Sequence, residues 1–214
     1  MPFVSTDGER TWGGRTLEDR RAQRREQLLD AGYVLLGDSG AAQVTVRGVC
    51  RAARLTERYF YESFDDREAL LVAVHARVAD EARAAIAAAV ADGPGEPVAR
   101  ATAAVEAFVL LLEEDPRRGR VLLGEVFSDN RLARAGVDMI PAFALLLAEQ
   151  IAGIFGALPE GPDALDGQLT SVALVGALAH LFSAWLEGTL AVSRERLVAH
   201  AVALIVAAGP VSSR

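Results

Sequence analysis

The sequence contains no lysine, and arginine supplies all 22 of its basic residues. Its single cysteine, Cys50, excludes an internal disulfide framework and a cysteine-rich zinc site. The three histidines are too few and too scattered for the usual metal-ligand spacings, so we expect no metal and no other cofactor. The first residues have no apolar segment behind a positive charge, so we expect no signal peptide and a cytoplasmic protein.

The composition is that of a globular chain, because 51% of the 214 residues are hydrophobic and 24% are charged. The charge is uneven. Residues 1–67 carry 11 arginines and 11 acidic residues, whereas residues 68–214 carry 11 arginines and 18 acidic residues, which gives the net charge of −7. This acidity argues against a whole surface devoted to nucleic acid but allows a local basic face.

Two stretches without charge, 167–186 and 197–213, approach the length of a membrane span. Polar residues interrupt the first, and the second contains a Gly-Pro pair near its end. We interpret both as helices that are apolar nearly all round and are buried in a bundle or an interface. No contact with a membrane is therefore expected.

The chain is predicted to be all-α, because alanine is abundant and glycine and proline fall between long periodic runs. Residues 1–16 are expected to form a disordered tail. Caps and breaks predict helices at 17–36, 45–53, 56–64, 66–91, 98–114, 117–127, 130–156, 163–191 and 194–208.

The helices predicted at 45–53 and 56–64 are unusually short, and only Arg54 and Leu55 separate them. Two short helices joined by a tight turn indicate a helix-turn-helix, whose second helix enters the major groove of DNA. The same pattern also fits two surface helices with solvated arginines, and spacing alone leaves both interpretations open.

The first residues of the second short helix fit the reading of DNA. Arg58 can donate two hydrogen bonds to guanine, and Glu57 can accept one from cytosine. Tyr61 can reach a phosphate, and Arg47 on the preceding helix can also enter the groove. The arginine run at 20–25 is either a phosphate contact or a solvated face.

A larger pattern in this region resembles the N-terminal domain of the TetR family of transcriptional regulators over residues 22–82. The residues that carry the resemblance are Leu28-Leu29-Asp30-Ala31, Leu35-Leu36, Gly40, Val44-Thr45-Val46-Arg47-Gly48-Val49, Ala52-Ala53, Leu55-Thr56, Tyr61-Glu62-Ser63-Phe64 and Arg67-Glu68-Ala69-Leu70-Leu71. It implies an N-terminal three-helix DNA-binding domain at 22–82, with the helix-turn-helix at 45–64. The remainder, 83–214, is then a C-terminal helical ligand-binding and dimerisation domain.

The resemblance also implies a set of DNA contacts on the two short helices and at the start of the fourth. It places a phosphate contact at Tyr61 and an anchor for the DNA backbone at Arg67, where the family usually has lysine. The full set is Thr45, Arg47, Thr56, Glu57, Arg58, Tyr59, Tyr61 and Arg67.

Four residues depart from the family pattern. Arg54 stands where the turn usually has glycine, so a positive φ is expected there at some energetic cost. Arg58 and the residue after it are bulkier than the usual pair, which indicates a different operator. Gly32 replaces a usual alanine and should slightly weaken its helix.

The C-terminal domain, which carries the excess of acidic residues, is expected to bind an apolar or aromatic small molecule. The candidate pocket lining is Phe108, Phe127, Met139, Phe143, Phe182 and Trp185, each of which also fits an ordinary core position. Small residues and two histidines on 163–191 and 194–208 are interpreted as a twofold four-helix dimer interface. They are Gly176, Ala177, His180, Ala184, His200 and Ala201.

These features together predict a DNA-binding transcriptional regulator, a ligand-released repressor that binds a palindromic operator in double-stranded DNA as a homodimer. An activator or a helical interaction protein without small-molecule control is the alternative. No nucleophile motif, metal spacing or phosphate-binding glycine loop is present, so an enzyme is not expected.

Overall fold

The computed structural model describes residues 16–91, 95–124 and 163–208, and every regular element in these ranges is a helix or a helical turn. The elements are α1 (Leu17–Ser39), the 3-10 turn η1 (Ala41–Gln43), α2 (Val46–Ala53), α3 (Glu57–Tyr61), α4 (Arg67–Ala91), α5 (Pro97–Glu114), α6 (Pro116–Gly119), the π-helical turn η2 (Arg120–Gly124), α8 (Asp163–Leu186) and α9 (Arg194–Ala207). The predicted all-α fold class is confirmed.

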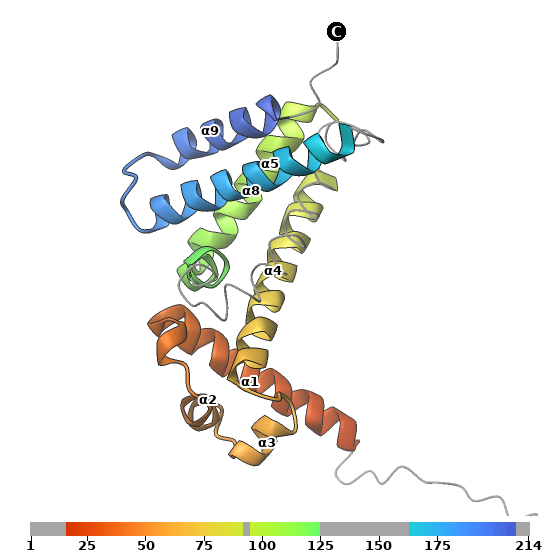
Figure 1. Cartoon of the computed structure of the whole chain (residues 1–214), viewed down its shortest axis with the longest axis vertical. Coiled ribbons are helices and arrows are strands. Elements are labelled where there is room, and N and C mark those ends of the chain that lie inside the picture. The colour runs from red at the N-terminus through yellow and green to blue at the C-terminus, as the bar shows by residue number, and fades with distance from the viewer. Residues whose placement is uncertain (1–15, 92–94, 125–162, 209–214) are drawn as a thin grey trace, which may run out of the picture.

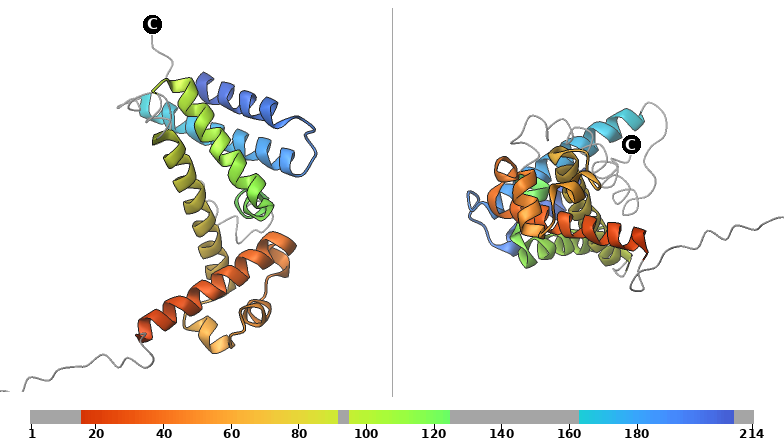
Figure 2. Two further views of the ribbon diagram at one scale, coloured as in Figure 1. Left: turned by 180° about the vertical axis from the view of Figure 1, so that it is seen from behind. Right: turned by 90° about the horizontal axis from the view of Figure 1, so that it is seen from below.

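The helices form two parts that α4 connects. At one end α1, α2 and α3 make a small unit with the first turns of α4, here called the head (Figure 1). At the other end α5, α8 and α9 pack together with the last turns of α4 and form the body (Figure 2). The boundary predicted between residues 82 and 83 lies inside α4, which belongs to both parts.

The head is built on capped helices around an aromatic and aliphatic core. Thr16 and Asp19 form a capping box that starts α1, with the Thr16 hydroxyl accepting from the Asp19 N–H at 3.1 Å. Leu28, Val49 and Phe60 are fully buried between the helices. Because Phe60 lies in the core, the opposite side of the short α3 faces outward.

Close packing of α1 on α4 fixes the head to the connecting helix. A Cβ atom added at Gly32 would lie 3.1 Å from Val74 Cγ2 and 3.2 Å from Leu70 Cδ2, both on α4. Glycine therefore brings the two backbones closer than alanine would allow without a shift of these side chains. The sequence predicts only a cost for Gly32, and the structure shows what this residue makes possible.

The body packs around the inner face of α5. Val109 and Leu112 of α5 and Leu197 of α9 are buried, and α9 lies along α5 over much of its length. Phe108 of α5 contacts Phe182 of α8 edge to face, with ring centres 5.2 Å apart.

Several helix ends differ from the prediction. The helix predicted at 163–191 ends at Leu186, because Gly188 adopts a φ of 73° and Leu190 N–H returns to the carbonyl of Ala184 at 3.0 Å. The helix predicted at 56–64 ends at Tyr61. That predicted at 117–127 is the four-residue α6 followed by η2, and the one at 130–156 lies outside the described residues.

None of the helices in the described residues combines the length and the apolar character that crossing a bilayer requires.

Candidate nucleic-acid interface

The turn between α2 and α3 sets the position of the second helix. Arg54 has φ 56° and ψ 36°, the left-handed conformation that glycine adopts most easily, so the predicted positive φ is confirmed. The backbone N–H of Leu55 donates to the carbonyl of Cys50 at 2.9 Å. The turn therefore closes tightly, and α3 starts at Glu57, beside the N-terminal half of α2.

Two arginines extend from this pair of helices into solvent. The side chains of Arg47 on α2 and Arg58 on α3 are 88% and 84% exposed. Arg47 Nε donates to Glu57 Oε1 at 3.2 Å, and Arg58 Nε donates to Glu62 Oε1 at 3.0 Å. Within the residues that the structure describes, the terminal nitrogens of both arginines make no further hydrogen bond. They are therefore free to donate to base edges, where a bidentate arginine reads guanine.

The two threonines of this region occupy helix starts. The Thr45 hydroxyl accepts from the Gly48 N–H at 3.0 Å, which confirms that it caps α2. Thr56 holds the corresponding position before α3, but its hydroxyl makes no capping hydrogen bond. The Thr56 hydroxyl thus remains a donor and acceptor at the tip of the head.

The two tyrosines of α3 lie in different environments. Tyr61 is 56% exposed, so its hydroxyl can approach a phosphate. Tyr59 is partly buried, and the guanidinium carbon of Arg24 lies 4.4 Å from its ring centre. Tyr59 thus packs against α1 through a cation–π contact. A DNA contact stays a prediction for both residues.

Three arginines of α1, here called the arginine clamp (Arg21, Arg24 and Arg25), hold the end of α3. Arg21 donates to the carbonyl of Glu62 and Arg25 to that of Ser63, both at 2.6 Å. These carbonyls follow the short helix, where no further turn of helix satisfies them. The clamp has a structural role that neither sequence interpretation of the arginine run includes.

The predicted anchor of the DNA backbone, Arg67, has its guanidinium turned into the head. Its Nε donates to the carbonyl of Val44 at 2.7 Å, and Nη2 contacts the carbonyl of Ala41. Nη1 pairs with Glu68 at 3.1 Å. Arg67 therefore ties the start of α4 to the segment before α2, and its contact with DNA stays a prediction.

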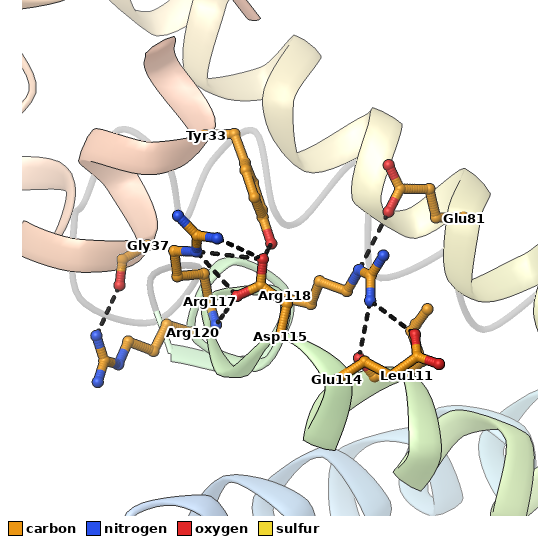
Figure 3. Close-up of polar contacts among 9 residues, drawn as sticks. All are labelled: Tyr33, Gly37, Glu81, Leu111, Glu114, Asp115, Arg117, Arg118 and Arg120. Atoms are coloured by element: carbon orange, nitrogen blue, oxygen red, sulfur yellow. Dashed lines mark hydrogen bonds and ion pairs between the residues drawn. The ribbon is translucent and has the colours of Figure 1, made fainter. Parts of the chain in front are cut away.

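Behind the head, α1 meets α6 of the body through Tyr33 and Asp115 (Figure 3). The Tyr33 hydroxyl donates to Asp115 Oδ2 at 2.7 Å. Arg117 binds the same carboxylate through two nitrogens, Nε to Oδ1 at 2.8 Å and Nη2 to Oδ2 at 2.9 Å. The hydrogen bond from the Arg117 side chain lowers the pKa of Asp115 to about 2, and burial together with Asp115 raises that of Tyr33. We call Tyr33, Asp115 and Arg117 the junction triad.

Two more arginines extend the contact on either side of the junction triad. Arg120 of η2 donates to the carbonyl of Gly37 in α1 at 2.8 Å. Arg118 contacts Glu81 of α4 and Glu114 of α5, each at 3.3 Å (Figure 3). The short α6 is thus bonded to α1, α4 and α5. In the sequence, Asp115-Pro116 indicates only a break between helices, and no local pattern predicts this junction.

His75 lies on the side of α4 that packs against η2. Burial lowers the pKa of its imidazole, and a hydrogen bond with the backbone of Leu122 opposes that effect. The Nδ1 atom is buried without a hydrogen-bonding partner. Burial therefore favours the neutral imidazole where α4 meets η2.

The predicted pocket lining is only partly covered by the structure. Phe108 and Phe182 are buried against each other, and Trp185 is partly buried beside the core. Phe127, Met139 and Phe143 lie outside the described residues. A different, open groove of about 500 Å³ lies between α5 and α9 and is lined by Thr102, Glu106, Arg194, Glu195, Val198, Ala199 and Val202. None of the predicted lining residues belongs to that groove.

The predicted dimer residues divide into two groups. Gly176, Ala177 and His180 on α8 are exposed, as is His200 on α9, and Ala184 is partly buried. The prediction for Ala201 is wrong, because this residue is 0% exposed in the core of one chain, on the face of α9 that packs inward. The small side chain allows close approach within the chain, not toward a partner.

The head is similar in sequence to a known family of proteins. Residues 28–74 match the family of bacterial regulatory proteins described as the tetR family. The matched segment runs from the core of α1 through the helix-turn-helix to the third turn of α4. No curated protein is a sequence match for the chain.

Solved structures share the fold over most of the chain. A tetR-family transcriptional regulator from Streptomyces coelicolor is 19% identical, with a TM-score of 0.66 over 87% of this chain and 80% of that one. The fatty acid degradation regulator FadR from Bacillus halodurans is 16% identical, with a TM-score of 0.63 over 89% and 97%. FadR from Bacillus subtilis, solved with stearoyl-CoA, is 14% identical, with a TM-score of 0.63 over 86% and 97%.

Proposed function

Since the chain belongs to the tetR family of bacterial regulatory proteins and is a transcriptional regulator rather than an enzyme, we propose that it is a repressor released by a small-molecule effector. It binds a palindromic operator as a homodimer in the cytoplasm. The observation that supports this most directly is the pair of exposed arginines, Arg47 and Arg58, whose terminal nitrogens are free at the tip of the head.

The DNA contacts divide by role. Arg47 and Arg58 read base edges, with Glu57 as an acceptor beside them. Tyr61 and Thr56, whose hydroxyl makes no capping hydrogen bond, contact phosphates. These contacts fix the position of the head along the duplex. Because residues 1–67 carry 11 arginines and 11 acidic residues, their attraction to DNA in general is weak, and the affinity depends on the specific contacts.

A second copy of the chain covers the outer face of α8 and α9. Exposed apolar and small residues lie on this face, including Leu169, Val172, Ala177 and Val206. Their burial in a twofold four-helix interface removes this apolar surface from water. Two heads related by a twofold axis require a palindromic operator.

The effector is apolar or aromatic, and the junction triad transmits its binding to the head. A ligand in the body that shifts α6 changes the contacts of Asp115 with Tyr33, and thereby the position of α1. A ligand releases DNA only to the extent that it binds the free form more tightly, and a hundredfold preference is about 2.7 kcal/mol. The acyl chain of the stearoyl-CoA bound by the Bacillus subtilis FadR, which shares this fold, supports the choice of apolar compounds.

Selection of bound duplexes from a random DNA pool tests the proposed DNA recognition. The expected result is a palindrome whose half-sites are about one helical turn apart, read by two heads. A sequence without twofold symmetry would contradict the dimeric reading, and the absence of any enriched sequence would favour the alternative of a helical interaction protein. Transcription from the selected site then distinguishes a repressor from an activator.

A thermal-shift screen with acyl-CoAs, free fatty acids and aromatic compounds tests the effector. A compound at about 100 times its dissociation constant stabilises the folded state by roughly 2.7 kcal/mol, which is about 5–10 °C for a chain of this size. The same compound must release the selected duplex. Stabilisation only by divalent metals or phosphorylated sugars would contradict an apolar effector and leave the DNA-binding function untouched.

A further inference from the structure

Glu62, the residue directly after α3, stands where a carboxylate costs affinity for DNA. It pairs with the exposed Arg58 of α3, so in the proposed complex with DNA it would lie near the phosphates of the duplex. A negative charge there repels the DNA backbone. We therefore expect the contacts of Glu62 to provide a favourable effect that outweighs this repulsion.

Stability does not explain the pair that Glu62 makes with Arg58. The Arg58 side chain is 84% exposed and that of Glu62 is 35% exposed, and exposed pairs of this kind contribute little to the free energy of unfolding. The order of charges along the helix, arginine before glutamate, is also the less favourable one for the helix dipole. The pair contributes little to the free energy of unfolding, but its geometry determines how the Arg58 guanidinium is oriented.

Glu62 is itself held from behind by the arginine clamp. Its backbone carbonyl accepts from Arg21 at 2.6 Å, and its Oε2 atom lies 3.9 Å from Arg24 Nη2. Arg24 is only 25% exposed and rests on the ring of Tyr59. A continuous series of contacts thus runs from Arg24 of α1 through Glu62 to the exposed Arg58.

The atom by which Glu62 holds Arg58 decides which donors are left for DNA. The hydrogen bond uses Nε–H at 3.0 Å, so the end of the planar guanidinium that the two terminal amino groups form makes no hydrogen bond to the carboxylate. These two groups are the ones that can reach O6 and N7 of one guanine together. A freely rotating Arg58 would lose side-chain entropy on binding, and it could also contact phosphates instead.

We propose that Glu62 is a specificity-determining positioning residue, which fixes the guanidinium of Arg58 by its Nε so that the two terminal amino groups read one guanine in each half-site. This inference rests on the proposed DNA-binding function. The carboxylate lowers the affinity for DNA of any sequence, but it increases the difference in affinity between a matched and an unmatched base pair.

The test measures base discrimination, not affinity alone. Duplexes selected by the wild-type protein from a random pool are altered one base pair at a time, and affinities are measured by fluorescence anisotropy for wild type, E62A, E62Q and R58A. E62A is expected to lower discrimination at the single guanine that R58A also affects by about fivefold or more, with discrimination at the other positions unchanged. E62Q, which keeps an acceptor oxygen in the same place, is expected to restore most of it.

Two further variants separate positioning from a merely structural role. In the R58A background, E62A is expected to cause no additional loss of discrimination, because Glu62 acts through Arg58. D80N removes one carboxylate from an exposed pair with Arg83 on α4, 2.7 Å apart and outside the recognition surface, and is expected to leave discrimination unchanged. Melting curves of all variants check that each one is folded.

The outcomes are distinct. If E62A discriminates like the wild type, or weakens all duplexes equally, the inference is wrong and the proposed function stands. If the wild-type protein enriches no sequence from the pool, both are wrong. A loss of discrimination in E62A that E62Q restores, at the guanine read by Arg58, supports the inference.

Discussion

At the scale of single residues, the arginines of this protein act mainly through the partners that hold them. Arg21 and Arg25 satisfy backbone carbonyls at the end of α3, and Arg67 does the same for the segment before α2. Guanidinium groups suit this task, because they carry several donors in a fixed plane and remain charged. Arg47 and Arg58 are held differently, because only their Nε atoms are paired and their terminal groups face solvent.

Arg54 stores strain that glycine would release. Its φ of 56° is unfavourable for a residue with a Cβ atom, so Arg54→Gly is expected to raise the free energy of unfolding by up to about 1 kcal/mol. Urea unfolding followed by circular dichroism measures the change. The matched control is Arg51→Gly, a helical position of α2, which is expected to lower the free energy of unfolding by about 1 kcal/mol. A loss of stability in both variants would contradict the strain.

The hydroxyl of Tyr33 is expected to support both stability and communication. Tyr33→Phe removes its hydrogen bond to Asp115 and should lower the free energy of unfolding by about 1–2 kcal/mol. Its affinity for the selected duplex should respond less to the effector than that of the wild type. Tyr61→Phe is the control, since this exposed residue should leave stability unchanged and weaken DNA binding. Equal effector responses in wild type and Tyr33→Phe would show that the triad does not transmit the signal.

At the scale of elements, the four-residue α6 connects the two parts of the molecule. It meets α1 through the junction triad and through Gly37, and it meets α8 where Leu186 lies against Gly119. Gly37 brings the backbones of α1 and α6 together, and Gly119 leaves room for the Leu186 side chain, so the position of α6 is coupled to both α1 and α8. A helix in this place can pass a displacement of α8 to the head.

The close approach of α1 and α6 is expected to be sensitive to one methyl group. A Cβ atom at Gly37 would lie 2.5 Å from Arg117 Cβ and 3.2 Å from Arg117 Cα, so the backbones must separate. Gly37→Ala should therefore lower the free energy of unfolding by about 1–3 kcal/mol, despite the better helix propensity of alanine. Gly176→Ala on α8 is the control, because its added Cβ meets nothing within 4 Å. Thermal unfolding compares the two, and equal melting temperatures would contradict the tight contact.

At the scale of the whole molecule, acid is expected to loosen the contact between head and body. The pKa of His75 lies below its ordinary value of 6.5, so the unfolded chain takes up this proton first as the pH falls. The contribution of neutral His75 is thus present above pH 6.5 and is lost progressively below it. The contribution of Asp115, whose pKa is lowered from 3.8 to about 2, is present above pH 3.8 and is lost as the pH falls toward 2.

The measurement is the free energy of unfolding in urea between pH 8 and pH 5. The wild-type value is expected to decrease as the pH falls through the region of the ordinary histidine pKa. In His75→Asn, which cannot take up a proton, this decrease should be smaller. The control is His200→Asn, an exposed position on α9, whose pH dependence should match the wild type. An unchanged slope in His75→Asn would rule out this imidazole as the cause.

Assembly is the second property of the whole molecule that can be tested. Ala177→Arg places a charge on the exposed face of α8 and should convert a dimer into a folded monomer, as light scattering would show. Ala201→Arg should instead unfold the body, because this side chain is 0% exposed within one chain. A wild-type protein that is monomeric at micromolar concentration would contradict both the dimer and the palindromic operator.

The sequence by itself determined the features that depend on near neighbours along the chain. Thr45 at the start of α2, the tight turn at Arg54 and the inward phenylalanine of α3 follow from caps and periodicity, which act over three or four residues. The exposure of Arg58 follows from the same periodicity. These local rules predicted the two short helices and the turn between them, and the resemblance to the TetR family identified them as a helix-turn-helix.

Only the tertiary structure decided which distant groups meet. Tyr33 and Asp115 are 82 residues apart in the sequence, and Arg21 lies 41 residues from the Glu62 carbonyl that it binds. Ala201 has the small side chain of an interface residue but faces inward, because the rotation of α9 against α5 is set by their packing. An arginine has many possible acceptors of similar energy, so its partner depends on which backbones the folded core brings within reach.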